Sequence, residues 1–190
     1  MIKHFVRGGQ EMKKFILGAL MVVFIPAVCQ AEGYVIVNYG IGGEIDEPSL
    51  GVEMGGIFLS YLHPTGGALS LGIGISAGDT DEDSPSALSP PSPAPAYDAL
   101  RDYNDGNEQE VYISFGAEMI PSFFGVAGLG YASQNTVTIG TSGVQNYEIG
   151  SDKDKFVTWM LGMRYIVEGV NVGLGYHSRR GILASLGIAF

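Results

Sequence analysis

The clearest structural pattern in the sequence is ALSLGIGIS, from Ala68 to Ser76. Every second residue in it is leucine or isoleucine, and the residues between are alanine, serine or glycine. This period of two predicts a β-strand with one large apolar face and one face of small residues. The exposed second face of a soluble sandwich carries charged and polar side chains. A small-residue face instead suits a narrow lumen, while the aliphatic face suits lipid.

Four more segments repeat this alternation clearly, and three repeat it more weakly. The clear segments are 110–119, 157–165, 170–177 and 182–190, and the weaker ones are about 33–43, 50–62 and 123–136. The total is eight strands of roughly ten residues, the length and pattern of transmembrane barrel strands. We therefore expect an all-β fold, an eight-stranded antiparallel transmembrane β-barrel. The alternative is a soluble β-sandwich.

Composition limits the other classes of protein. The chain has 190 residues, 29 of them glycine, and only 16 % are charged, against about 25 % in typical soluble domains. After residue 30 no stretch of eighteen apolar residues occurs, which excludes a transmembrane helix there. The length fits one domain.

The first 31 residues are typical of a secretory signal peptide. Lys13 and Lys14 precede an apolar run that ends at Pro26, which is too short to span a membrane. We expect translation to start at Met12 and cleavage to follow Ala31, which leaves residues 32–190 as the barrel. Val28, the residue before the single cysteine, disfavours a lipoprotein.

Cleavage there changes the charge balance of the chain. The leader holds four of the ten basic residues and one of the twenty acidic residues, so six basic and nineteen acidic residues remain. This excess of acid excludes nucleic acid as a partner. No disulfide can form, because the single cysteine is removed with the leader.

The predicted connections alternate between long and short until the last one, at 177–181. Long loops are expected at about 42–49, 79–108 and 137–152, and short turns at 63–66, 120–122 and 168–169. Bacterial outer-membrane barrels have short periplasmic turns and longer outer loops. Eight strands place both chain ends in the periplasm.

Residues 32–190 resemble the small eight-stranded outer-membrane barrels of the OmpA, OmpX and opacity-protein type. The C-terminal Ile188-Ala189-Phe190 adds a more specific likeness, because such barrels commonly end in an aromatic residue. The resemblance implies that the barrel-assembly machinery reads Phe190 and Ile188. It also implies a place in the outer membrane of a Gram-negative bacterium and contact with its lipid and lipopolysaccharide. The role expected is surface interaction, adhesion or envelope support through acidic outer loops.

The long loop at 79–108 is acidic and contains five prolines between Pro85 and Pro95, which favour an extended chain. It could meet a surface partner or bind divalent cations, or be a solvated loop without a ligand. Residues 102–107 only weakly resemble a calcium loop, because the glycine falls one residue early. The sequence predicts no metal site and no cofactor.

Two alternative functions remain open: a lipid A-modifying enzyme, and a narrow pore or carrier for small apolar ligands. His177 and Ser178 could suggest a hydrolase, but adjacent strand residues point to opposite faces, so we expect no catalytic residue. Arg179 and Arg180 are expected to meet lipopolysaccharide phosphates, since guanidinium groups suit phosphate.

The small-residue faces also carry a few charges. Arg164 is the clear basic residue there, and Glu53, Glu110 and Glu118 are the acids. Arg164 and Glu118 both precede a short turn by a few residues, whereas the other two acids fall nearer the outer end. Since a buried charge needs a partner, we expect an ion pair between Arg164 and Glu118 inside the lumen.

Overall fold

The computed structural model describes residues 32–45, 48–59, 67–80 and 82–190. The expected start at Met12, the cleavage after Ala31 and the turn at 63–66 lie outside the described residues, so they stay predictions. No helix in the described ranges is long and apolar enough to cross a membrane.

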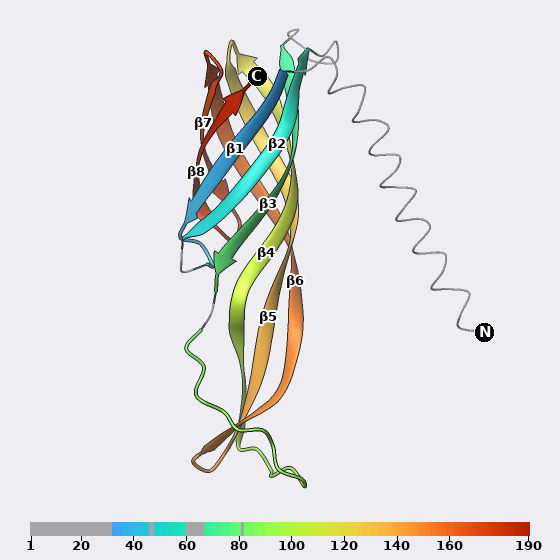
Figure 1. Ribbon diagram of the computed structural model, residues 1–190, viewed down its shortest axis with the longest axis vertical. Helices are drawn as coiled ribbons and strands as arrows, with labels where there is room; N and C mark the ends of the chain where they lie inside the picture. The colour runs from blue at the N-terminus through green and yellow to red at the C-terminus, as the bar shows by residue number, and fades with distance from the viewer. Residues whose placement is uncertain (1–31, 46–47, 60–66, 81) are drawn as a thin grey trace, which may run out of the picture.

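Eight antiparallel strands form a closed ring in chain order, with β1 hydrogen-bonded to β8 (Figure 1). The strands are β1 (Glu32–Ile41), β2 (Ser49–Leu59), β3 (Ala68–Asp79), β4 (Ala99–Ile120), β5 (Phe123–Ser142), β6 (Gln145–Val167), β7 (Val170–His177) and β8 (Gly181–Ala189). The predicted eight-stranded antiparallel barrel is therefore confirmed.

The two faces of each strand follow the predicted alternation. On β3, Ser70 and Ser76 are buried in the lumen, while Ile73 and Ile75 face outward. The exterior is aliphatic and aromatic on the other strands too, as Leu129, 61 % exposed, shows. Large apolar side chains this exposed, all round a closed ring, match a barrel whose solvent is lipid.

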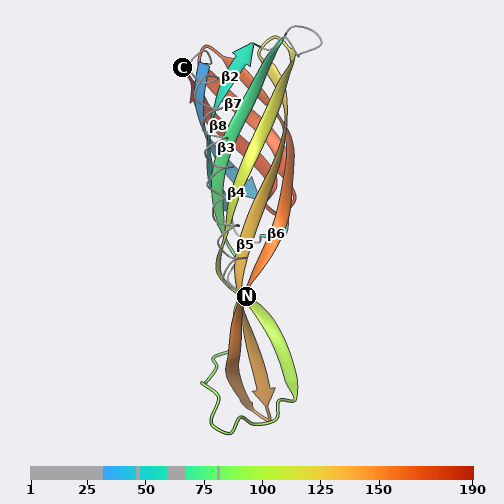
Figure 2. The same cartoon turned by 90° about the vertical axis from the view of Figure 1, so that its right-hand side faces the viewer.

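Strands β4, β5 and β6 continue past the end of the other five as a protruding three-stranded sheet (Figures 1 and 2). Two expected loops are thereby corrected. The loop expected at 79–108 ends at residue 98, because β4 begins at Ala99. The loop expected at 137–152 is a strand hairpin with its turn at 143–144. Both faces of this hairpin are largely polar, so the apolar period that marks the other strands is missing.

The strand register climbs around the barrel. Hydrogen-bonded neighbours lead from Glu118 on β4 through Phe124 and Arg164 to Gly173, and onward through Ser185, Asn38, Gly51 and Ser76 to Glu110. One circuit therefore returns to β4 eight residues from its start. This stagger, required to close a tilted barrel, decides which lumen residues meet.

Candidate functional site

The centre of the lumen is held by one bidentate ion pair. Arg164 of β6 donates from Nη1 to Oε1 of Glu53 on β2 over 2.8 Å, and from Nη2 to Oε2 over 2.6 Å. The Tyr34 and Ser114 hydroxyls donate to the same carboxylate. The Glu53 side chain is fully buried and that of Arg164 is 8 % exposed. A buried pair of this kind is stable only when its hydrogen bonds are made.

The predicted pair between Arg164 and Glu118 is wrong. Glu118 lies at the start of the climbing row, and the buried Phe124 separates it from Arg164. Its carboxylate accepts instead from the backbone N–H groups of Ala68 and Ser122. Arg164 meets Glu53 because the stagger of the strands places Arg164 level with the middle of β2.

Apolar side chains fill the lumen from Phe124, near the end that carries the chain termini, to Met160 and Leu183, nearer the other end. The buried cluster there consists of Ala68, Tyr112, Phe124, Val126, Met160 and Leu183, with Ile57 and Ile166 packed against it. A small eight-stranded barrel has room for side chains but for no aqueous channel. This packing therefore does not favour the pore alternative.

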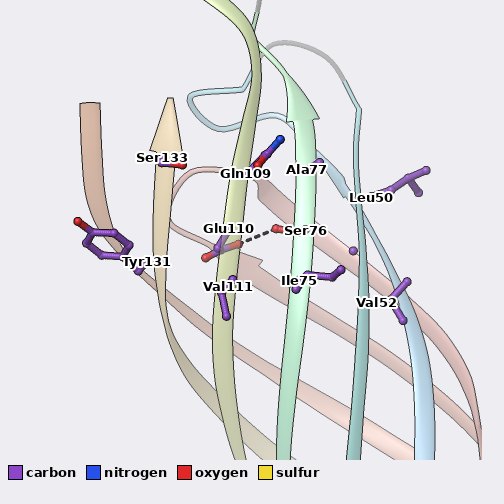
Figure 3. A pocket seen from close by; sticks show the side chains of 11 residues that line it. Leu50, Val52, Ile75, Ser76, Ala77, Gln109, Glu110, Val111, Tyr131 and Ser133 are labelled. Atoms are coloured by element: carbon purple, nitrogen blue, oxygen red, sulfur yellow. Dashed lines mark hydrogen bonds between the residues drawn. The ribbon is translucent and has the colours of Figure 1, made fainter. Parts of the chain in front are cut away.

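A second polar cluster lies at the other end of the lumen, where the protruding sheet joins the barrel. Glu110 of β4 accepts from Ser76 over 2.7 Å, as Figure 3 shows, and also from Thr158. Its Oε1 lies 2.9 Å from Nε2 of His177, which is 2 % exposed. The sequence indicated that Glu110 faces the lumen, but His177 as its partner was missed, because the two belong to distant strands.

His177 has no nitrogen free for catalysis. Its Nδ1 accepts the backbone N–H groups of Arg179 and Arg180, both over 3.2 Å, while Nε2 faces Glu110. The Ser178 hydroxyl accepts the backbone N–H of Trp159. Because a nucleophile needs a base within hydrogen-bond reach, this geometry does not favour a hydrolase.

The expected contact of Arg179 and Arg180 with lipopolysaccharide is not what the structure shows, because both side chains turn inward. Arg179 pairs with Glu108 and Glu44, and its guanidinium lies over the Phe156 ring, 4.0 Å from the centroid. Arg180 is 2 % exposed. The sequence did not reveal that neighbouring carboxylates and residues of the lumen wall would contact these two guanidinium groups.

Arg180 reaches furthest into the mouth of the barrel. Its Nε donates to the Ser49 hydroxyl over 2.9 Å, and its Nη2 is buried without a hydrogen-bond partner. Burial lowers the pKa of this guanidinium, against the nearby negative charges of Glu110 and Glu108. The residue closes the mouth rather than displaying a charge outside it.

The β1–β2 loop completes this closure. The carbonyl oxygen of Arg179 accepts the N–H groups of Glu44 and Ile45, over 2.9 and 3.1 Å. Gly43 lies against the same oxygen with a φ of 87°. Ile45 is 2 % exposed. The hairpin and the loop together seal the lumen at this end.

A groove of about 570 Å³ crosses β2 to β5 near the same end (Figure 3). Outward-facing residues line most of it, among them Leu50, Val52, Ile75, Val111 and Tyr131. It is mainly a hollow in the apolar exterior surface, and the lumen-facing Ser76 and Glu110 also contribute to its lining.

The protruding sheet exposes charged residues of both signs. Its strands carry Asp102, Asp105, Glu148, Asp152 and Asp154 against Arg101, Lys153 and Lys155. No group of three or more His, Cys, Asp or Glu side chains that could hold a metal ion occurs among the described residues. Residues 102–105, part of the weak calcium motif, belong to strand β4, where Asp102 accepts from Thr138.

The two edges of this sheet differ. The segment after β3 covers the β4 edge, where Thr80 and Glu82 donate to the carbonyl oxygens of Gly106 and Asn104. On the β6 edge, Leu88 forms an isolated β-bridge with Tyr147. Pairing of β6 with β7 begins only at Met160 and His177. Among the described residues, no strand pairs with this side of β6 from Gly150 to Val157, and we call this stretch the free edge.

The predicted assembly residues lie at the seam of the barrel. The backbones of Phe190 and Gly33 exchange two hydrogen bonds. Phe190 is 72 % exposed, and Ile188 faces outward from β8. Both side chains are therefore accessible. Their recognition by the barrel-assembly machinery stays a prediction.

The ring of eight strands, the filled lumen and the apolar exterior define a membrane-spanning β-barrel. No protein-family model matches the chain, and no curated protein sequence matches it. Similar solved structures include Ail, the attachment invasion locus protein of Yersinia pestis. The structure of Ail in complex with the heparin analogue sucrose octasulfate shares 9 % sequence identity with this chain, with a TM-score of 0.43. The match covers 84 % of this chain and 96 % of the Ail chain. Ail in a second structure is 10 % identical over the same shares, with a TM-score of 0.42.

Proposed function

We propose that this protein is a bacterial outer-membrane barrel that binds a partner at the cell surface through its protruding sheet, in adhesion or a related surface interaction. The observation that carries the proposal is the continuation of β4, β5 and β6 beyond the sealed barrel, with one edge of β6 open. An open strand edge offers a row of backbone donors and acceptors to an extended segment of another protein.

The position in the membrane is supported by the barrel exterior. Trp159 and Tyr176 face outward near the sheet end and contact each other, with ring centroids 5.8 Å apart. Tyr165 and Phe190 face outward near the opposite end. Aromatic residues at both borders of an apolar band are typical of outer-membrane barrels, and the barrel-assembly machinery would insert the chain with the sheet outside.

The charge of the protruding sheet bears on the kind of partner. A heparin analogue is a polyanion, and Ail binds one, but this sheet carries more acidic than basic residues. We therefore expect a protein partner here, recognised by its backbone and by mixed charges.

Two shortened proteins test the proposal. In the sheet-less variant, a four-residue Gly/Ser loop joins Asp79 to Asn107, and Asn-Gly joins Gln134 to Asp154; both pairs are in register in the ladder. In the matched loop variant, residues 83–96 become a Gly/Ser segment of equal length. Bacteria displaying each protein are compared for adherence to host cells.

We expect the sheet-less variant to lose adherence and the loop variant to keep it. Equal surface amounts and equal gel migration of folded samples establish that both barrels are intact. Adherence that survives in the sheet-less variant contradicts the proposal, as does a loss that the loop variant reproduces in full.

A further inference from the structure

The free edge of β6 carries an alternating charge pattern. Asp152 and Asp154 point to one face of the protruding sheet, and Lys153 and Lys155 point to the other. All four are exposed, and their neighbours on β5 are the uncharged residues 133–136. The four charges are therefore not neutralised across the β5–β6 ladder.

The backbone geometry shows which residues would pair with an added strand. The Trp159 carbonyl oxygen accepts the N–H of Ser178, so Trp159 directs its backbone groups toward β7. By the alternation of a strand, Ser151, Lys153, Lys155 and Val157 direct theirs toward the free edge. Within the described ranges, no other backbone group pairs with them on this side. The Lys153 N–H donates to its neighbour Asp152 over 2.7 Å, a bond that an added strand must displace.

A second copy of this edge does not fit it. In antiparallel pairing, opposite residues both face the partner or both face away. Registers that bring the charged residues together would then place lysine against lysine and aspartate against aspartate, and like charges directly opposite are destabilising. No antiparallel register of two such edges places lysine directly opposite aspartate. In parallel pairing within one membrane, the second β6 would run on into the place that β7 occupies from His177 onward.

We propose that the β6 edge from Ser151 to Val157 is the recognition element of the sheet, and that it selects an extended segment of another protein in which acidic and basic residues alternate. Acidic side chains of that segment lie against Lys153 and Lys155, and basic ones against Asp152 and Asp154. This proposal rests on the proposed function, because it names the partner chemistry of the same sheet. The alternation supplies selectivity twice, since it attracts the inverse pattern and repels a second copy.

Peptide binding to the full chain in nanodiscs tests the proposal. The probe is the capped peptide Thr-Val-Glu-Lys-Glu-Lys-Val-Thr, and its control is the isomer Thr-Val-Lys-Lys-Glu-Glu-Val-Thr, which has the same composition and net charge. Amide chemical shifts of residues 150–158 report the site. We expect about tenfold tighter binding of the alternating peptide, from four matched cross-strand pairs. The same peptide N-methylated at its four charged residues should not bind.

The variant K153E/K155E makes one whole edge acidic and leaves the β5–β6 ladder in place. It should lose the alternating peptide and bind Thr-Val-Lys-Lys-Lys-Lys-Val-Thr instead, while the wild type shows the reverse order. Equal binding of the two isomers, binding of the N-methylated peptide, or an edge-to-edge dimer of the wild type would overturn the proposal. Adherence that depends on the sheet while the peptides show no preference would overturn only this inference and leave the proposed function standing.

Discussion

The buried charge of Arg164 is compensated by a partner on another strand. Its guanidinium lies inside the lumen, where an unpaired charge is costly, and Glu53 supplies two parallel hydrogen bonds. Tyr34 adds a ring whose centroid lies 5.6 Å from the guanidinium carbon. The pair joins β2 to β6 across the barrel, so it links strands that share no backbone ladder.

Removing either partner should leave the other charge buried and unpaired. We expect Arg164→Met and Glu53→Gln each to lower the free energy of unfolding by about 3–5 kcal/mol, and the double variant to cost less than the sum. Urea unfolding in lipid vesicles measures this coupling. The control cycle combines Arg164→Met with Glu118→Gln and should show coupling near zero. Stronger coupling to Glu118 than to Glu53 would refute the observed pairing.

At the scale of single elements, the β5–β6 hairpin shows how a strand escapes detection in the sequence. Residues 137–152 are largely polar and were predicted as a loop. Their two strands nevertheless pair with each other up to Ser142 and Gln145 beside the turn, with one register shift between Thr138 and Ile139. β-branched residues suit a strand here. The segment after β3, by contrast, is proline-rich and has little regular pairing.

Limited proteolysis with thermolysin should separate these two segments. We expect the first cuts between residues 83 and 98, where Ala87, Leu88 and Ala94 offer apolar sites in an irregular chain. The hairpin should survive, although Val144 is 99 % exposed, because a two-residue turn cannot enter a protease without opening the ladder. Mass spectrometry identifies the fragments. Early cleavage at Val144 or Ile149 would contradict the strand assignment.

At the scale of the whole molecule, stability in lipid depends on closing the ring at β1 and β8. Closure leaves no edge within the membrane, where an unpaired backbone group has no water to bind. The folded barrel should therefore stay folded in detergent unless it is boiled. On a gel, the unboiled sample should migrate differently from the boiled one. Gly187 marks the tightest point of the seam, since an added Cβ would lie 2.1 Å from the carbonyl oxygen of Val35.

Gly187→Val should weaken closure and reduce the fraction of fast-migrating, unboiled protein severalfold. Gly150→Val is the matched control, because a Cβ at Gly150 meets nothing within 4 Å. Both proteins are refolded under the same conditions and compared on gels with and without boiling. Equal folded fractions would show that the β1–β8 seam tolerates a side chain at this position.

The class of fold could be predicted from the sequence, because period-two alternation depends only on local strand geometry. The inward faces of Glu53, Glu110 and Arg164 could be predicted for the same reason. Which of these residues meet depends on the closed barrel. Its register climbs eight residues in one circuit, so Arg164 reaches Glu53, and Glu110 lies beside His177. The inward direction of the Arg179 and Arg180 side chains also depends on partners distant in the chain. The same holds for the protruding β5–β6 hairpin, so neither feature could be predicted from the sequence.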